Sequence, residues 1–317
     1  MAEIENILIA GAGAIGTLVA HQFQQSLSCQ VGILAGGERL ERYRTRGFSV
    51  NGHPTGFRFV DVENDEIFDL VVVACKNHHL PRILEDVGRH VGPRTLFLSL
   101  LNGITSEEKI GSVFGAERIP YAMIVGTDAG FHDGRLDYTV AGTIVFGDAR
   151  NDGCRSPRVA AIARAFERAG IRHQVPDDML GRLWYKFMFN VGVNQVSAVL
   201  RRPFHVFQTS TSDPCAARLM DQAMREAAAV ARAEGVILTE SDIASVWTTL
   251  DTLSHLGRTS MLQDVLAGRK TEVELFSAQV IALADRHRIE APVNRFLHDA
   301  LRAIESTYGL EPERATA

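Results

Sequence analysis

Three polar side chains recur at every fourth position inside an otherwise apolar segment. Lys186, Asn190 and Asn194 interrupt a run of mostly apolar residues between Leu183 and Val193. In a helix, residues spaced by four lie on one face, and apolar side chains on the other faces predict a buried helix. Burial of a lysine lowers its pKa toward the range useful for proton transfer. The stripe therefore indicates a lysine acid beside two amides that bind a polar substrate, unless Lys186 extends to solvent at the helix edge.

A glycine-rich hexapeptide near the N-terminus has the spacing of a phosphate-binding turn. Gly11-Ala12-Gly13-Ala14-Ile15-Gly16 follows an apolar strand-like run and opens a helical pattern, as the G-x-G-x-x-G fingerprint requires. Gly11 permits the tight turn, Gly13 has no side chain to block a pyrophosphate, and Gly16 allows close packing of helix and strand. The phosphates then bind N–H groups at the positive end of the helix. The turn predicts a dinucleotide cofactor.

The residues after the second predicted strand bear on which dinucleotide binds. In NAD-binding turns an acidic residue at this place accepts the ribose hydroxyls. Here the chain reads Leu34-Ala35-Gly36-Gly37, and the first acid is Glu38. No carboxylate is placed to repel a 2′-phosphate, and Arg39 or Arg42 is near enough in sequence to bind one. This favours NADP(H) and leaves NAD(H) open.

The elements that position these residues begin with an alternation of strands and helices. Continuous β-branched runs such as Asp69 to Ala74 fit strands that are covered on both faces of a parallel sheet. We expect strands at 6–10, 30–34, 69–74 and 95–100, with helices at 14–26 and 80–89. Glycines punctuate short β-prone stretches between Ile119 and Gly147, which indicates an antiparallel extension. A helix at 156–169 and a strand at 171–175 follow.

The strand signal stops after residue 176, and helical patterns take its place. They cover residues 180–200, 215–234, 241–249, 260–267, 271–286 and 293–307. The predicted fold class is α/β, with an N-terminal Rossmann-type doubly wound sheet followed by an all-helical C-terminal domain. We expect a dinucleotide-binding domain over residues 1–176 and a helical domain for substrate binding and dimerisation over residues 177–317.

Composition excludes several classes of protein. The 317 residues contain 33 Lys+Arg against 38 Asp+Glu, a formal net charge of −5, which disfavours a general nucleic-acid binder. The longest apolar runs are far shorter than the ~20 residues that span a bilayer. The acidic start leads directly into an apolar run, so we expect no signal peptide and a cytoplasmic protein. No His, Cys, Asp or Glu grouping has metal-ligand spacing, so no metal is predicted.

Five elements, taken in order, resemble the ketopantoate reductase (2-dehydropantoate 2-reductase, ApbA/PanE) family over essentially the whole chain. They are the glycine turn, a lysine after an apolar strand, an Asn-Gly pair, the polar stripe, and a Ser–Glu block with a twelve-residue step. These correspond to Gly11–Gly16, Lys76, Leu101-Asn102-Gly103, Lys186 with Asn190 and Asn194, and Ser260 to Glu272. The resemblance implies reduction of a branched 2-oxo acid by NADPH, with a Rossmann domain and an all-helical second domain.

The resemblance implies roles for the residues of the second domain. Lys186 would donate the proton to the alkoxide that forms as hydride reaches the keto carbon. Glu272 would orient Lys186 and hydrogen-bond the substrate. Asn190, Asn194 and Ser260 would hold the substrate carboxylate and hydroxyl. A cationic lysine opposing the charge that develops on oxygen makes this assignment electrostatically coherent.

Two residues of the first domain are implied at the nicotinamide end of the cofactor. Asn102 would position cofactor and substrate, and Lys76 would contact one or the other. Both lie near the carboxyl ends of sheet strands, where an open α/β sheet binds ligands. Each also has an ordinary explanation, since Asn-Gly is a common turn dipeptide and a lysine after a buried strand fits a solvated loop.

Two residues of the Ser–Glu block have structural explanations as well. Ser260 fits the cap of its own helix. Thr271 and Glu274 have the spacing of a capping box. In that arrangement Glu272 is one more first-turn acid favoured by the helix dipole.

Three positions depart from the family's pattern. Phe204, in Arg202-Pro203-Phe204, stands where pantoate-forming members tend to carry Asn, and Gly257 stands in place of another Asn. Gly36 stands where many members place an arginine for the 2′-phosphate. These departures leave the proton-donating residues intact and bear on substrate identity and cofactor preference. Phe204 makes the pocket more apolar and favours a bulkier or less hydroxylated 2-oxo acid.

The expected function is NADPH-dependent reduction of a 2-oxo acid, with ketopantoate converted to pantoate for pantothenate and coenzyme A biosynthesis. The expected partners are a small-molecule 2-oxo acid and a second copy of the chain in a homodimer, with no nucleic acid and no membrane. A related 2-oxo acid or 3-hydroxy acid dehydrogenase with a more apolar substrate stays open. So does an NADP(H)-sensing protein without catalysis.

Overall fold

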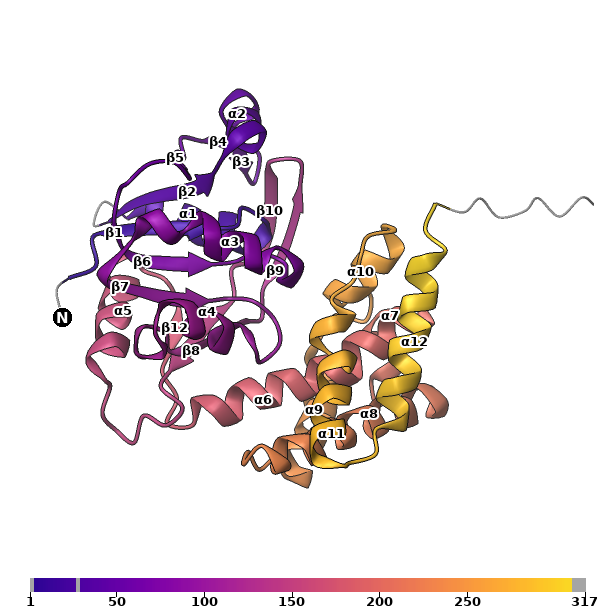
Figure 1. Cartoon of the computed structure of the whole chain (residues 1–317). Coiled ribbons are helices and arrows are strands. Elements are labelled where there is room, and N and C mark those ends of the chain that lie inside the picture. Colours follow the sequence, from indigo (N-terminus) through magenta and orange to yellow (C-terminus); the bar gives the residue numbers. More distant parts are fainter. Residues whose placement is uncertain (1–2, 27–28, 310–317) are drawn as a thin grey trace, which may run out of the picture. The chain divides into compact units, whose positions relative to one another are not determined.

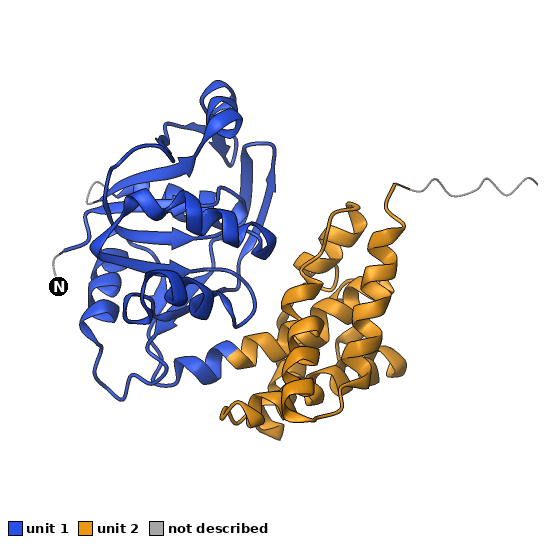
Figure 2. Ribbon diagram, in the orientation of Figure 1, with its two compact units in different colours: residues 1–183 blue, residues 184–317 orange. Residues whose placement is uncertain are grey.

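The computed structural model describes residues 3–26 and 29–309. They belong to two compact units, Met1–Leu183 and Trp184–Ala317, shown in separate colours in Figure 2. The division falls inside helix α6 (Met179–Phe189), which contributes residues to both units. The boundary predicted at residue 176 precedes this helix.

A five-stranded parallel sheet forms the centre of unit 1 (Figure 1). Its strands, in spatial order, are β5 (Arg58–Asp61), β2 (Gln30–Ala35), β1 (Asn6–Ala10), β6 (Phe68–Val73) and β7 (Val91–Ser99). The chain runs from β1 outward to β2 and β5, then returns to the other side of β1 for β6 and β7. The strand order therefore reverses at β1, and ligands of open α/β sheets bind at the carboxyl ends of strands at such a point.

Helices cover both faces of this sheet. They are α1 (Ala14–Gln25), α2 (Gly37–Arg46), α3 (Leu80–Asp86), α4 (Ser106–Phe114) and α5 (Pro157–Arg168). Alternate side chains of β1 enter two different cores: Ile7 and Ile9 pack with residues of α1 and α5, whereas Leu8 and Ala10 pack with residues of α3 and α4. The predicted doubly wound sheet is confirmed.

Two smaller sheets extend unit 1. Their strands are β3 (Phe48–Val50), β4 (His53–Thr55), β8 (Tyr121–Val125), β9 (Asp128–His132), β10 (Arg135–Val140), β11 (Thr143–Gly147) and β12 (His173–Gln174). The pairs β8–β11 and β9–β10 are antiparallel, as the glycine-punctuated segment indicated. The pairs β3–β10 and β11–β12 are parallel, which the sequence did not predict.

Unit 2 consists of helices and turns throughout its described residues. Besides most of α6, its helices are α7 (Gln195–Leu200), α8 (Pro214–Ala233), α9 (Glu240–Thr252), α10 (Ser260–Leu266), α11 (Ser277–His287) and α12 (Pro292–Ser306). The all-helical second domain is therefore confirmed. In neither described stretch of the chain is a helix long and apolar enough to cross a membrane.

The helix predicted over 271–286 is wrong in its first part. A 3-10 turn covers Val273–Leu275, and α11 begins only at Ser277. The N–H and hydroxyl groups of Thr271 both donate to one carboxylate oxygen of Glu305 on α12, at 2.8 and 2.6 Å. The predicted capping box with Glu274 is absent because this tertiary partner engages Thr271 instead.

A single π-helical turn, Asn190–Asn194, joins α6 to α7. The backbone N–H of Gln195 donates to the carbonyl of Gly192. Its side-chain amide donates to the carbonyl of Val191 at 2.8 Å, the acceptor that its own N–H would use in an α-helix. The amide oxygen of Gln195 accepts the N–H of Ser277 at 3.1 Å, and the whole residue is buried.

We expect Gln195→Leu to lower the free energy of unfolding by about 1–3 kcal/mol, because the buried Ser277 N–H then loses its side-chain acceptor and the Val191 carbonyl loses its side-chain donor. Denaturant unfolding monitored by circular dichroism measures this. Leu200→Gln, on the partly exposed end of the same helix, is the control and should change stability by less than about 0.5 kcal/mol. Equal stability of Gln195→Leu and the natural chain would contradict the assignment.

Candidate active site

The three glycines of the turn after β1 are required for three different reasons. Gly11 has φ of +116°, and a Cβ there would lie 2.6 Å from the carbonyl oxygen of Ala74. A Cβ on Gly16 would collide with the carbonyl of Gly11, so α1 packs directly against the turn. A Cβ on Gly13 would meet no atom within 4 Å, and Gly13 is exposed. Open space at Gly13, beside the first N–H groups of α1, fits a pyrophosphate.

Lys76 follows β6, and Asn102 follows β7, the two strands on one side of β1 in the sheet. Because β1, β6 and β7 are adjacent and parallel, the segments after them leave the same edge of the sheet. Lys76 precedes a 3-10 turn, and Asn102 precedes Gly103, whose φ is +86°. Both side chains are half-buried. The sheet thus brings together the glycine turn, Lys76 and Asn102.

A buried hydrogen-bond network closes the base of the loop that carries Asn102. The Ser99 hydroxyl donates to that of Ser106 at 2.7 Å, and Ser106 donates to Glu107 at 2.8 Å. The other carboxylate oxygen of Glu107 accepts the N–H of Ala122 at 3.2 Å. Burial raises the pKa of the nearby Tyr121, and the negative charge of Glu107 raises it further. Sequence reasoning missed this network, because Glu107 has the pattern of an ordinary first-turn acid.

The end of β2 carries no carboxylate, as the sequence indicated. A Cβ on Gly36 would lie 2.5 Å from a methyl group of Val62, so the position has no room for the arginine common in the family. The first cation after β2 is Arg39, in the first turn of α2. Its guanidinium lies 3.4 Å from the buried carboxylate of Asp86, which Arg82 also contacts at 2.9 Å.

In unit 2 the polar stripe runs along α6 and the π-helical turn. Lys186 is half-buried in α6, and Asn190 and Asn194, at the two ends of the π-helical turn, are 8% and 6% exposed. In a regular α-helix, side chains spaced by four drift by roughly 40° per step. A π-helical turn holds more residues and reduces that drift. Among the hydrogen bonds of the described residues, none involves the side-chain amide of Asn190 or Asn194, and neither amide is among the polar atoms that are fully buried without a partner. Both amides therefore keep some contact with solvent, as groups that receive a polar ligand must.

Ser260 and Glu272 also belong to unit 2. Helix α10, which begins with Ser260, packs against α7 and the π-helical turn. Its cap is Thr259, whose hydroxyl accepts the N–H of Leu262 at 3.0 Å, so Ser260 is not the cap and is exposed. Glu272 is half-buried and immediately precedes the 3-10 turn Val273–Leu275.

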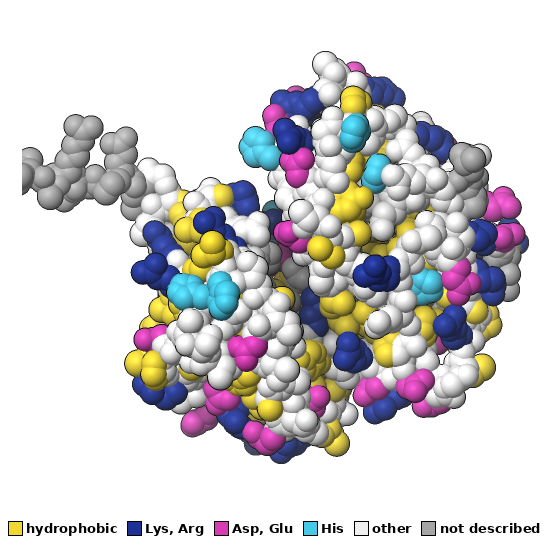
Figure 3. Space-filling view, turned by 180° about the vertical axis from the view of Figure 1, so that it is seen from behind, with side chains coloured by type: hydrophobic (Ala, Val, Ile, Leu, Met, Phe, Trp, Pro, Cys, Tyr) yellow, Lys and Arg dark blue, Asp and Glu magenta, His cyan; other side chains and the backbone are white. Residues whose placement is uncertain are grey.

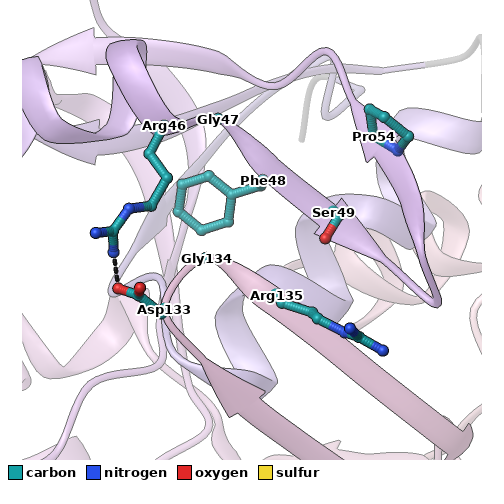
Figure 4. Close-up of a pocket in the computed structure, with 8 residues that line it drawn as sticks. All are labelled: Arg46, Gly47, Phe48, Ser49, Pro54, Asp133, Gly134 and Arg135. Carbon is teal, nitrogen blue, oxygen red and sulfur yellow. Dashed lines mark ion pairs between the residues drawn. The ribbon is translucent and has the colours of Figure 1, made fainter.

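A hollow of about 200 Å³ lies elsewhere in unit 1, between the end of α2 and the strands β3, β4 and β10 (Figure 4). Arg46 and Asp133 pair across it. None of the predicted site residues lines this hollow. Over both described stretches, no group of three or more His, Cys, Asp or Glu residues is arranged to hold a metal ion. Figure 3 shows cationic and anionic side chains interspersed on one face rather than gathered by sign.

A parallel sheet that reverses at β1 and carries an open glycine turn at that point defines a dinucleotide-binding protein. The helical unit carries the lysine and the two amides of the polar stripe. Comparison with known sequences identifies the family. The chain belongs to the ketopantoate reductase family. The family model described as "Ketopantoate reductase PanE/ApbA" matches residues 7–151, and the model of the family's C-terminal part matches residues 178–305.

Named relatives and solved structures match nearly the whole chain. The 2-dehydropantoate 2-reductase of Halobacterium salinarum is 28% identical over 94% of this chain and 98% of its own length. A 2-dehydropantoate 2-reductase structure from Geobacter metallireducens is 26% identical, covers 94% of this chain and 99% of its own, and has a TM-score of 0.81. The structure of D-mandelate dehydrogenase with NADH and anilino(oxo)acetate covers 96% and 100%, with 22% identity and a TM-score of 0.85. The last likeness shows the fold.

We expect Gly13→Ala to weaken cofactor binding at least about tenfold, while the melting temperature stays within about 2 °C. The added methyl meets no protein atom within 4 Å, and the φ of −87° suits alanine, so only a bound pyrophosphate is obstructed. Titration of cofactor fluorescence against calorimetric melting separates the two effects. Gly88→Ala, which also adds a methyl in open space, is the control and should bind cofactor normally. Unchanged affinity in Gly13→Ala would rule out the turn as the phosphate site.

Proposed function

We propose that this protein reduces a 2-oxo acid to the 2-hydroxy acid with NADPH, and that ketopantoate is converted to pantoate. The family, together with relatives named 2-dehydropantoate 2-reductase, supports this reaction. The observation that carries the proposal is the row of Lys186, Asn190 and Asn194 on one face, where the two asparagines are 8% and 6% exposed and no hydrogen bond among the described residues involves their amides.

The cofactor is held by residues of unit 1. The N–H groups of the Gly11–Gly16 turn bind the pyrophosphate, and Lys76 and Asn102 contact the nicotinamide end at the carboxyl edge of β6 and β7. A bound nicotinamide supplies the hydride. These residues fix the position and orientation of the ring, which is the part of the reaction that the protein controls.

Lys186 supplies the proton. Hydride addition to the keto carbon places negative charge on the carbonyl oxygen, and a protonated lysine at that oxygen stabilises the charge and then donates its proton. Glu272 orients the ammonium group and accepts a hydrogen bond from the substrate. Asn190, Asn194 and Ser260 hold the carboxylate and the hydroxyl of the substrate with neutral donors, and Lys186 serves the reacting oxygen.

Arg39 supports the preference for NADP(H). It lies in the first turn of α2, after a strand end without a carboxylate, and its guanidinium pairs with Asp86 at 3.4 Å. A guanidinium held in this way presents donors to a 2′-phosphate. Arg42, one turn further along α2, is the second cation available.

A homodimer is part of the proposal. A ketopantoate reductase from Staphylococcus aureus whose solved structure covers 96% of this chain is described as dimeric. Sedimentation of the purified chain measures its oligomeric state.

We expect Lys186→Ala to lower kcat for ketopantoate reduction by about 10²–10⁴-fold, the usual contribution of a positioned proton donor, with the Kd for NADPH unchanged. Steady-state rates at the nicotinamide absorbance band and cofactor titration measure the two quantities. Lys109→Ala, at an exposed lysine of α4, is the control and should retain full activity. Full activity of Lys186→Ala would refute the assignment. NADPH binding by the natural chain without turnover of any 2-oxo acid would favour the sensing protein instead.

We expect the natural chain to use NADPH better than NADH and Arg39→Ala to lower kcat/KM for NADPH by about 10-fold or more, because a hydrogen bond between charged groups contributes about 1.5–3 kcal/mol. The kcat/KM for NADH should not change. Asp86 keeps Arg82 as a partner in this variant, so the fold is retained. Arg42→Ala tests the other candidate in the same assay. A natural chain that prefers NADH would contradict the NADP(H) assignment.

A further inference from the structure

The ring of Phe204 occupies the space that a side chain at residue 257 would fill. The 3-10 turn Phe204–Phe207 runs beside the loop before α10, where the N–H of Phe204 donates to the carbonyl of Gly257 at 3.0 Å and that of His205 to His255 at 3.2 Å. A Cβ built on Gly257 would lie 2.8 and 3.0 Å from two carbons of the Phe204 ring and 2.9 Å from the carbonyl oxygen of Ser254. The ring therefore lies directly against the glycine, and any larger residue at 257 would crowd both the ring and this carbonyl.

This pair is connected to the residues proposed to bind substrate. The Ser197 hydroxyl donates to the carbonyl of Arg202 at 2.6 Å and lies 3.5 Å from the hydroxyl of Thr259. Ser197 follows Asn194 by less than one turn of α7, and Thr259 is the cap residue immediately before Ser260. Hydrogen bonds thus place the segment of Phe204 and the loop of Gly257 beside Asn194 and Ser260.

Packing in the core of unit 2 does not by itself explain a phenylalanine at residue 204. Phe207, in the same 3-10 turn, is fully buried and supplies the core contacts of this segment. Phe204 is only half-buried, so part of its ring surface remains accessible. An accessible aromatic surface near Asn194, whose amide has no hydrogen bond among the described residues, has the composition of a ligand site, where apolar walls surround a few placed polar groups.

We propose that Phe204, seated on Gly257, determines substrate specificity by contacting the side chain of the 2-oxo acid. This rests on the proposed function, with the carboxylate and reacting oxygen held by the polar stripe. The ring offers no hydrogen-bond partner, so it binds an apolar, branched or aromatic side chain and gains nothing from a terminal hydroxyl. An apolar wall discriminates against an added hydroxyl by at most about 10²-fold, whereas a site that hydrogen-bonds a hydroxyl rejects the analogue without it by about 10⁴-fold or more. Ketopantoate is therefore accepted for its dimethyl branch.

The test uses two acids that differ only in that hydroxyl, ketopantoate and 3,3-dimethyl-2-oxobutanoate. We expect the natural chain to show a ratio of kcat/KM, ketopantoate over its deoxy analogue, of about one or lower. Phe204→Asn, which supplies hydrogen-bonding groups, should raise this ratio by about tenfold or more, and Phe204→Leu, which stays apolar, should leave it within about threefold. A ratio above about ten in the natural chain, or an unchanged ratio in Phe204→Asn, would overturn the proposal.

Two further variants separate specificity from folding. Phe296→Asn makes the same substitution at an exposed phenylalanine of α12 in the same unit and should leave the ratio unchanged. Gly257→Ala leaves the ring in the protein but crowds it together with the Ser254 carbonyl, so the ratio should change even if Phe204→Asn fails to fold. An unchanged ratio in a folded Gly257→Ala would count against the proposal. Absence of turnover with both acids in the natural chain would contradict the proposed function itself, whereas turnover with a ratio insensitive to Phe204 and Gly257 would contradict only this inference.

Discussion

The side-chain amide of Gln195 donates to a backbone carbonyl where α6 gives way to α7. Its acceptor is the Val191 carbonyl, at 2.8 Å, which the N–H of Gln195 would use in a regular α-helix, so the side chain holds the π-helical turn. Without that turn, Asn190 and Asn194 would drift further around the helix away from Lys186. The amide also donates to the side-chain oxygen of Asn294 at 3.3 Å, so α12 helps to hold the same turn. Alignment of the polar stripe thus depends on one buried side chain that has no place in the proposed chemistry.

In the proposed function, the two units bind anionic ligands by different means. Unit 1 uses fixed backbone geometry, since Gly11, Gly13 and Gly16 remove side chains where a strand, a helix and a pyrophosphate must approach each other. Unit 2 uses side chains held by burial. A formal net charge of −5 attracts no anion, so affinity must come from these local groups rather than from the overall field.

Sequence reasoning succeeded where local pattern and tertiary structure agree. The bounds predicted for β1, and the start of α1 at Ala14, follow from periodicity and the glycine turn alone. It missed α2, whose ten residues bury only Leu40 and so show no apolar period. The capping box at Thr271 failed because Glu305, distant in sequence, competes for the same groups. The π-helical turn was not predictable either, because it depends on tertiary partners of Gln195.

Phe204 and Gly257 show how two departures from a family pattern are connected in the structure. Considered separately, each is the loss of an amide and leaves a gap in a binding site. The structure places the phenylalanine ring against residue 257, at 2.8 Å from its Cβ position, so a phenylalanine at 204 leaves no space for a side chain at 257. The carbonyl oxygen of Ser254 lies 2.9 Å from the same position, so the ring and the backbone both favour glycine there. In the proposed site, the pair is an apolar substitution for two polar side chains. Selection that preserved Lys186, Asn190 and Asn194 while exchanging this pair would alter which 2-oxo acid binds without altering the chemistry performed on it.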